Sequence, residues 1–443
     1  MIQAVAAPAI SAGDTAWVFV ASALVLLMVP GLALFYGGLV RSRAALNTLM
    51  MSFGALAVVT VQWTMMGYSL SFAPGTIIGD LRWFGFHNVG AAVGPYSSTI
   101  PHAAFAVFQA MFAGITVALI SGAMVERIRF HMYLIFAFLW TTFVYDPLAH
   151  WVWATDGFLH KLGALDFAGG TVVHISAGVG ALVAAMILGR RRALGRTPLR
   201  PHNVVFTLTG AGLLWVGWLG FNAGSALAAD GVAANALATT HAAAAAALVM
   251  WLIIDYWRTG QATAVGAATG AVVGLVAITP AAGYVTPGAA LLIGALASGA
   301  SQTAIHLRNK TKVDDALDVF ACHGVAGMLG ALLTGVFATT SVNPAGANGL
   351  LYGNPHLLLV QTIAVLCTVV FAAPLTAVIL YGLSAVGAIR VGLANEVGGV
   401  DFSEHGEHAY DDGDSSPLHG VGTRLGDAVV LSTTPRPRET AAA

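Results

Sequence analysis

The sequence predicts an all-α integral membrane protein with eleven transmembrane helices: an inverted five-plus-five helix repeat, an extra C-terminal helix, and the N-terminus outside. Three observations support this prediction. Apolar residues make up 57% of the 443 residues and charged residues only 9%, against roughly 25% charged in soluble domains. Mean hydropathy is correspondingly high, at +0.79. The basic residues are distributed unevenly between alternate connections, and two of the apolar runs open on related acid–histidine motifs.

The apolar runs are long enough to cross a bilayer as helices. No window alternates apolar and polar residues with the period of a barrel strand, which excludes a β-barrel architecture. The predicted spans are residues 15–40, 45–72, 101–125, 131–153, 168–189, 203–227, 232–257, 262–280, 286–306, 316–339 and 356–388.

The basic residues orient these spans. Of the 19 Lys and Arg residues, only Arg82 and Lys161 fall on the connections that lie outside if the N-terminus is outside. Because cytoplasmic loops carry the excess of Lys and Arg, we expect an external N-terminus and a cytoplasmic C-terminus. Residues 1–390 are then the transmembrane domain, 391–410 a C-terminal region ordered on the cytoplasmic face, and 411–443 a disordered cytoplasmic tail, since their composition is polar and rich in Gly, Ser and Pro.

The fifth and tenth spans open on related motifs. Asp166 precedes His174, and Asp318 precedes His323 in a near-echo with similar flanking residues. Five helices per repeat invert the second copy. Each histidine lies about seven residues into its span, roughly 10 Å deep, so the two should meet near the midplane. Ionisable residues inside a membrane indicate a functional site.

Other interpretations of the polar residues are weaker. A histidine alone in a membrane helix is more often a hydrogen-bonded structural residue, and His241, among alanines, is interpreted in that way. A metal site needs three or four ligands, and Cys322 points about 100° away from His323 around a helix; no metal or cofactor is expected. The segment 404–408, with two Glu and two His, is interpreted as a solvated tail that binds metal at most adventitiously. Cys322 and Cys367 lie in apolar runs, which does not indicate a disulfide, and residues 4–9 resemble the end of a signal peptide, which suggests a start codon assigned too late.

Aromatic residues gather near the predicted outer mouth. Trp153 closes the fourth span, Phe108 and Phe112 lie one turn apart in the third, and Phe221 and Ser225 share a helical face in the sixth. An interfacial aromatic belt would also account for tryptophans here. The hydroxyl beside the rings favours a cation site, because ring faces and a hydroxyl suit a small cation that has shed its water.

At this point the sequence resembles the ammonium transporter family (Amt/Mep/Rh), in its bacterial Amt-type form, from Ala7 to Tyr410. The motifs that carry the resemblance are Phe35-Tyr36-Gly37-Gly38-Leu39, Glu126-Arg127-Ile128-Arg129-Phe130, Ala149-His150-Trp151-Val152-Trp153, Asp166 to His174, Gly220-Phe221-Asn222-Ala223-Gly224-Ser225, Thr279-Pro280 with Gly283-Tyr284, Asp318 to Gly324, and His405-Gly406-Glu407 with Ala409-Tyr410.

The resemblance implies a homotrimer with one pore per subunit, in the cell (inner) membrane. It implies a selective ammonium/ammonia transporter for nitrogen assimilation, not an enzyme, in contact with the lipid bilayer and not with nucleic acid. A trimeric PII-type signal protein on the cytoplasmic face is a further expected partner. The residue roles it implies are ammonium recruitment at Trp153, Phe112 and Ser225, with Phe108 beside them; a phenylalanine gate at Phe112 and Phe221; structural and electrostatic support from Asp166; and a pore at His174 and His323, lined also by Trp218, Tyr36, Thr279 and Asn222.

Four features depart from the family pattern. His131 and Asp146 stand where neutral residues are expected, Cys322 flanks a pore histidine, and Pro374 should interrupt the last span. Two other functions remain open: an ammonium sensor, for which the tail of about 50 residues is too short to be a kinase or cyclase domain, and a Rh-like channel for neutral gas, against which the aromatic cation site argues.

Overall fold

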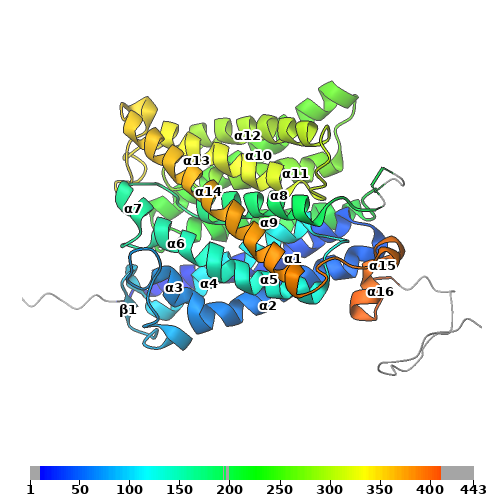
Figure 1. The fold of residues 1–443 in the computed structure, drawn as a ribbon. Helices are drawn as coiled ribbons and strands as arrows, with labels where there is room; N and C mark the ends of the chain where they lie inside the picture. Colours follow the sequence, from blue (N-terminus) through cyan, green and yellow to red (C-terminus); the bar gives the residue numbers. More distant parts are fainter. Residues whose placement is uncertain (1–9, 193, 196–198, 411–443) are drawn as a thin grey trace, which may run out of the picture. The chain divides into compact units, whose positions relative to one another are not determined.

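The computed structural model describes residues 10–192, 194–195 and 199–410. Over these residues the chain is almost entirely helical (Figure 1). The first half contains α1 (Ala12–Leu39), η1 (Ser42–Ala44), α2 (Ala45–Gln62), η2 (Trp63–Gly67), α3 (Tyr68–Phe72), η3 (Phe84–Phe86), β1 (Val93–Gly94), β2 (Ser97–Pro101), α4 (His102–Ile120), η4 (Ser121–Ala123), α5 (Phe130–Trp140), η5 (Thr141–Tyr145), α6 (Asp146–Trp153), α7 (Phe158–Leu162), η6 (Gly170–Ile175) and α8 (Ser176–Leu188). The second half contains α9 (Val204–Gly224), α10 (Gly231–Thr259), α11 (Ala264–Ile278), α12 (Pro287–Arg308), η7 (Phe320–Val325), α13 (Ala326–Phe337), η8 (Leu350–Tyr352), α14 (Pro355–Val386), α15 (Leu393–Gly398) and α16 (Val400–His405).

The predicted all-α membrane fold is confirmed. Within the described ranges, ten helices are long and apolar enough to cross a membrane, and each coincides with a predicted span. The predicted span 262–280 corresponds to α11, which has only 15 residues and is shorter than the 17 or so that a crossing needs. The short antiparallel hairpin β1–β2 was not predicted; it lies in the connection before α4. Two strands this short give no usable sequence period, so the alternation test could not find them.

Proline does not interrupt the last span, contrary to our expectation. α14 runs through Pro374 without a break, and α1 likewise contains Pro30. A proline is tolerated in a membrane helix where neighbouring groups satisfy the carbonyl that it frees.

The two halves of the chain have equivalent elements at their centre. η6 and η7 are both π-helical turns of six residues, and each is followed by a regular helix. α8 follows η6 and packs against η7, while α13 follows η7 and packs against η6. The two segments therefore run antiparallel to one another, as an inverted repeat requires.

This crossing depends on small residues. A Cβ atom on Gly178 would lie 2.2 Å from the backbone nitrogen of Gly324. No side chain fits between the two backbones here, so glycine at this position is what allows α8 and η7 to approach closely.

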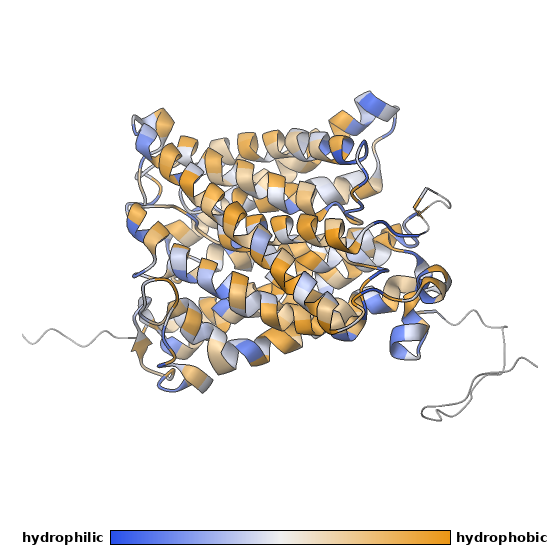
Figure 2. Cartoon of the chain, in the orientation of Figure 1, coloured by the Kyte–Doolittle hydropathy of each residue, from blue (hydrophilic) through white to orange (hydrophobic). Residues whose placement is uncertain are grey.

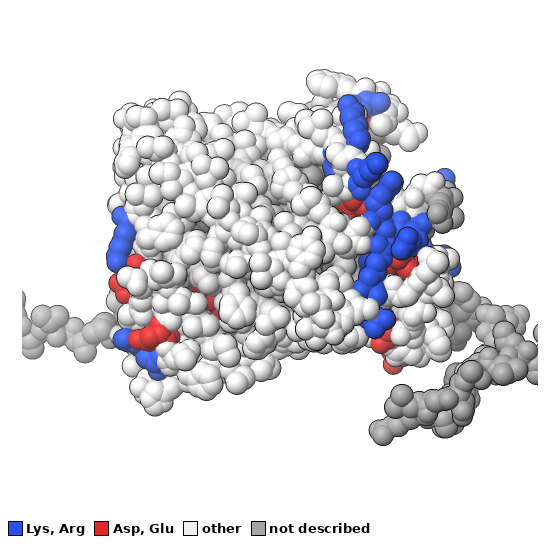
Figure 3. All heavy atoms as spheres, viewed as in Figure 1, with Lys and Arg blue, Asp and Glu red and all other residues white. Residues whose placement is uncertain are grey.

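Charge is segregated along the helices. Apolar residues cover the helices between their ends (Figure 2), and Lys and Arg form a band at the end that carries α15 and α16 (Figure 3). A smaller group of basic and acidic residues lies at the opposite end (Figure 3). Of the two basic residues predicted to be outside, Arg82 pairs with Asp80 and Lys161 with Asp156. The band is the end that the positive-inside rule assigns to the cytoplasm.

The residues that follow α14 fold against this basic end. Both carboxylate oxygens of Asp401 accept amides at the start of α2, from Leu46 (3.1 Å) and Asn47 (2.8 Å), and Glu404 accepts the amide of Phe130 (2.9 Å) at the start of α5. Acids at helix N-termini satisfy amides that have no partner within the helix. The region 391–410, which we expected to be ordered, thus contacts the N-terminal ends of α2 and α5. The tail 411–443 and residues 1–9 lie outside the described residues.

Candidate functional site

The centre of the bundle holds two facing histidines. His174 on η6 and His323 on η7 place their Nδ1 atoms 3.4 Å apart, with ring centroids 5.4 Å apart and planes inclined by 29°. Both side chains are buried, and π-helical turns of this kind often occur at functional sites. The contact between two Nδ1 atoms requires one ring to donate and the other to accept, so the two neutral imidazoles are opposite tautomers that share one hydrogen bond.

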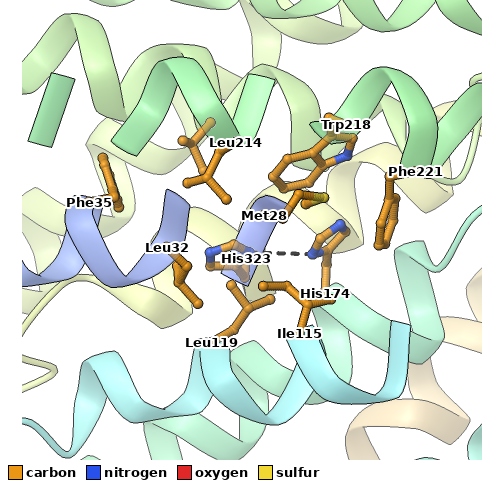
Figure 4. Close-up of a pocket in the computed structure, with 11 residues that line it drawn as sticks. Met28, Leu32, Phe35, Ile115, Leu119, His174, Leu214, Trp218, Phe221 and His323 are labelled. Carbon is orange, nitrogen blue, oxygen red and sulfur yellow. Dashed lines mark hydrogen bonds between the residues drawn. The ribbon is translucent and has the colours of Figure 1, made fainter. Parts of the chain in front are cut away.

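A narrow cavity of about 330 Å³ surrounds this pair. Phe35 and Phe221 lie at its two ends, with the imidazoles between them (Figure 4). Apart from the histidines and the Trp218 indole, its lining carries only carbon and sulfur; the other residues are Met28, Leu32, Ile115, Leu119, Leu214 and Val272.

One ring atom in this cavity has no protein partner. The Nε2 atom of His174 is buried and forms no hydrogen bond with any described residue. Buried polar atoms are nearly always paired, so an unpaired imidazole nitrogen in an apolar cavity is suited to hydrogen-bonding a small polar guest.

Trp218 fixes the orientation of His174. Its indole stacks on the imidazole at 5.3 Å and 22°, and its Nε1 donates to the Thr279 hydroxyl at 2.8 Å. Thr279 in turn donates to the carbonyl of Leu275. The predicted pore residues Trp218 and Thr279 therefore form a chain that leads to the histidine.

Beyond Phe221 lies the predicted aromatic cluster. Phe112 and Phe221 stack with centroids 4.0 Å apart and planes inclined by 19°, and they separate the cavity from Trp153. The Trp153 ring stands perpendicular to Phe112 at 6.2 Å, and Phe108 packs edge-on against Phe112 at 4.9 Å. Phe108, Phe112, Phe221 and Trp153 thus form one aromatic cluster next to the Phe221 end of the cavity.

Ser225 directly follows α9, and its hydroxyl donates to the Phe221 carbonyl at 2.8 Å. The oxygen keeps its lone pairs, so it can still accept a hydrogen bond.

Asp166 supports both the cluster and the histidine. Its carboxylate accepts the amides of Gly169 (2.8 Å), Gly170 (2.5 Å) and Thr171 (2.7 Å), and also the Thr171 hydroxyl. The backbone carbonyl of Asp166 accepts the indole of Trp153 at 3.0 Å. The carboxylate therefore satisfies the first amides of η6, the helix that carries His174.

The counterpart of Asp166 in the second repeat is Asp315, not Asp318 as the near-echo suggested. Asp315 precedes His323 by eight residues, as Asp166 precedes His174, and it accepts the amide of Phe320 at the start of η7 at 2.7 Å. Burial raises the pKa of the Asp315 carboxyl, and the amides it accepts oppose this shift.

Asp318 has a different backbone conformation and a different partner. It adopts a positive φ of 56° and pairs with Arg308 at 2.8 Å. Burial raises the pKa of the Asp318 carboxyl to about 7, although Arg308 opposes this shift. The two acids differ because only one of them faces the helix start.

A second cavity of about 1080 Å³ continues from His323 toward the basic end. Its lining includes His323, Tyr36, Cys322, Asp255 and Asp318. The predicted pore residue Tyr36 lies here, with its hydroxyl donating to the Leu119 carbonyl at 3.1 Å.

Other predicted or unusual residues lie elsewhere. Asn222 lines neither cavity and donates to the Thr240 hydroxyl at 2.9 Å. His241 is exposed beside Trp215, His131 is exposed, and Asp146 is completely buried.

Sequence reasoning missed most of the apolar lining, although its signal was present. Phe108, Phe112, Ile115 and Leu119 fall on one face of α4, at intervals of three and four residues. Leu214, Trp218, Phe221 and Ser225 follow the same rule on α9. These stripes point into the bundle as any core face would, and only the polar members distinguished them.

Comparison with known proteins gives consistent results. Residues 16–410 match the profile described as Ammonium Transporter Family. The chain is 49% identical over 402 residues to a Bacillus subtilis (strain 168) protein named "Ammonium transporter", covering 90% of this chain and 99% of that protein.

Solved structures agree with this match. The crystal structure of Saccharomyces cerevisiae Mep2 is 39% identical and superposes with a TM-score of 0.80, covering 85% of this chain and 86% of that one. A structure titled "Sensor Amt Protein" is 29% identical with a TM-score of 0.81, covering 89% of this chain and 98% of that chain.

Proposed function

This chain belongs to the ammonium transporter family and is a multi-pass membrane protein, and we propose that it recruits ammonium at the outer aromatic cluster, deprotonates it, and conducts ammonia past His174 and His323. The transport would cross the cell (inner) membrane and supply nitrogen assimilation. The observation that carries the proposal is the cavity itself: two imidazoles enclosed by carbon surfaces, with an aromatic cluster at one end.

The cost of moving charge favours ammonia over ammonium in this cavity. Transfer of an intact ion into an apolar medium costs tens of kcal/mol by Born solvation, and the lining offers no carboxylate to offset it. Ammonia is neutral and forms hydrogen bonds as donor and acceptor. The neutral histidine pair can form a hydrogen bond with ammonia through a ring nitrogen. Neither partner carries a charge that would have to be desolvated.

The outer cluster supplies what the ion needs before it loses its proton. Ring faces attract a cation with about 0.5–2 kcal/mol each, and the hydroxyl of Ser225 is an acceptor. Desolvation lowers the pKa of a cationic acid, so an ammonium ion held against Trp153, Phe108 and Phe112 gives up its proton more readily than in bulk water. The proton passes to water at the outer mouth, and ammonia enters the cavity. The stacked pair Phe112 and Phe221 must part for the neutral molecule to pass, which makes it the gate.

Asp166 contributes in two ways under this proposal. Its carboxylate fixes η6, which carries His174, and its carbonyl fixes the Trp153 indole. The negative charge also lies on the floor of the recruitment cluster. Tyr36 lines the inner part of the path, Trp218 and Thr279 orient His174, and Asn222 joins α9 to α10 through Thr240.

Assembly and regulation follow the same family reasoning. We infer a homotrimer with one pore per subunit, and a PII-type signal protein as a partner on the basic face that carries Arg190 to Arg192. Membranes that hold the full chain should retain a trimeric PII-type protein in a sedimentation assay, and a charge-reversed Arg190→Glu variant should retain less. Equal retention by membranes without the chain would contradict the partner.

The function is tested in proteoliposomes on a solid-supported membrane, by recording current and lumenal pH during ammonium and potassium pulses. The proposal predicts a response to ammonium and none to potassium. A pH change without any current and without dependence on Trp153 would support the Rh-like gas channel instead. Ammonium binding without transport would support the sensor.

A further inference from the structure

Two buried polar residues on α6 have no part in the function proposed above. Asp146 and His150 are both fully buried. They are four residues apart, so they lie on one face of the helix. Asp146 is also one of the residues that departs from the family pattern.

The Asp146 carboxylate is held by neutral donors. Gln62 donates from Nε2 at 2.7 Å, and the hydroxyl of Ser71 approaches at 3.3 Å. Across the described ranges, it forms no direct ion pair with a Lys, Arg or His within 4.0 Å. A buried carboxylate without a counter-charge is costly, so a positive charge close by would stabilise it.

His150 has an acceptor at each ring nitrogen. Nδ1 lies 3.2 Å from the carbonyl oxygen of Ser71, and Nε2 lies 3.1 Å from that of Gly75. A carbonyl oxygen only accepts, and a neutral imidazole carries one N–H. In the neutral form one nitrogen lone pair would face a carbonyl lone pair; in the imidazolium form both contacts are hydrogen bonds.

From these contacts we infer that His150 is an imidazolium whose charge is balanced by Asp146, and that this pair is a positioning device for Trp153. Ser71 joins the two residues, because its hydroxyl donates to Asp146 and its carbonyl accepts from His150. The charges are thereby held one helical turn apart, with a common partner between them.

His150 can position Trp153 because α6 is short. The helix ends at Trp153, three residues after His150. The two hydrogen bonds of His150 fix this end of α6 to the chain at Ser71 and Gly75, and so set the angle at which the Trp153 indole reaches the Asp166 carbonyl (3.0 Å). This step rests on the proposed recruitment role of Trp153; the charge state of His150 does not.

The charge state is measured directly by solid-state NMR of the intact protein in lipid at pH 7. Ala149–His150 is the only Ala–His pair in the sequence, so carbonyl-¹³C alanine with ¹⁵N histidine identifies its signal without a mutant. Two protonated ring nitrogens with similar shifts are expected. One non-protonated nitrogen would overturn the inference, since the proton would then reside on Asp146 or be absent.

The positioning role is measured by uptake and by melting of Asp146→Asn, His150→Gln and the double variant. Each single change should raise the half-saturating ammonium concentration roughly three- to thirtyfold, the range of a lost cation–π contact, with the maximal rate per folded protein unchanged. The double variant should melt higher than either single one, because removing one partner leaves a buried charge uncompensated. Additive losses in stability, or unchanged half-saturation in folded variants, would overturn the positioning pair.

Failure of the proposed function can be distinguished from failure of this inference. If Trp153→Leu leaves half-saturation unchanged, the recruitment role is wrong, while the NMR signal and the recovery of stability still test the charge pair. If a single variant does not fold, the NMR measurement on the unmodified chain and the melting of the double variant remain decisive.

Discussion

His174 and His323, separated by 149 residues of sequence, place their Nδ1 atoms 3.4 Å apart at the centre of the bundle. The contact exists because η6 and η7 cross antiparallel, each with an acid eight residues before its histidine. Two equivalent halves therefore build one symmetric element, to which the outer aromatic cluster is added on one side only.

Topology is the first prediction. A reporter inserted after Gly195 should be cytoplasmic, and one inserted in the 346–354 loop external, because of the distribution of the 19 basic residues. The measurement is the accessibility of each reporter in intact cells. A reversed pattern at either site would contradict both the orientation and the assignment of the basic band to the cytoplasm.

Trp153→Leu should weaken apparent ammonium affinity without unfolding the protein. Loss of a cation–π contact of about 0.5–2 kcal/mol corresponds to a roughly three- to thirtyfold higher half-saturation. The matched control is Trp257→Leu, which removes a tryptophan that is 81% exposed on α10, and it should transport normally. Equal half-saturation in the two variants would assign Trp153 to the aromatic belt.

Asp166→Asn should abolish transport although Asn usually caps helices as well as Asp. The two oxygens of Asp166 accept hydrogen bonds from four backbone amides and a hydroxyl, and an amide side chain has only one oxygen. Each donor left unpaired costs about 1–3 kcal/mol, and the charge below the cluster is lost as well. Uptake and melting temperature are the measurements.

The control is Asp230→Asn, because Asp230 caps α10 by accepting one hydrogen bond from the Ala233 amide and should tolerate the change. Normal uptake by a folded Asp166→Asn protein would leave that carboxylate with a capping role alone.

The stability of the inner mouth should depend on pH through Asp318. Its pKa is raised to about 7 by burial, against the opposing effect of Arg308, while an unfolded Asp titrates near 3.9. Between these values the folded state binds more protons than the unfolded state, so the free energy of unfolding falls as pH rises from about 4 to 7 and then levels.

Allowing for partial solvent exposure, the change should be no more than about 2 kcal/mol. It is measured as the pH dependence of the melting temperature in the chain and in Asp318→Asn, which should lack this component. Identical pH profiles would show that Asp318 keeps an ordinary pKa.

Hydropathy and the acid–histidine motifs predicted the spans, the repeat and the proximity of the two histidines, because these follow from periodicity and charge. The identity of the second acid could not be predicted in the same way. Asp315 and Asp318 both precede His323, and only the three-dimensional start of η7 decides which of them receives the Phe320 amide. The available signal was the spacing of eight residues that Asp315–His323 shares with Asp166–His174. The shorter Asp318–His323 interval was chosen instead.

The positions of other polar residues could not be predicted from the sequence either. Nothing in the sequence distinguishes Asn222, which bonds to Thr240 behind α9, from a residue that faces the cavity. Similarly, the partners of Asp146 come from α2 and α3, more than 70 residues earlier, so its burial depends on tertiary packing that local sequence does not encode.

The histidine pair should set selectivity. Replacing His174 by Asp puts a fixed negative charge in the cavity, which would then favour any desolvated cation, so potassium should enter. Replacing both histidines by Ala should leave a folded protein with lost or altered selectivity. The control is Cys322→Ser, next to His323 but outside the pair, which should keep the selectivity of the unmodified chain.

The most direct test of the account is the uptake of ammonium and potassium by proteoliposomes, normalised to folded protein, for the unmodified chain, His174→Ala and His323→Ala. The account predicts that both variants fold and that their ammonium-to-potassium ratio falls. Stable variants with an unchanged ratio would contradict a role for the two histidines in conduction.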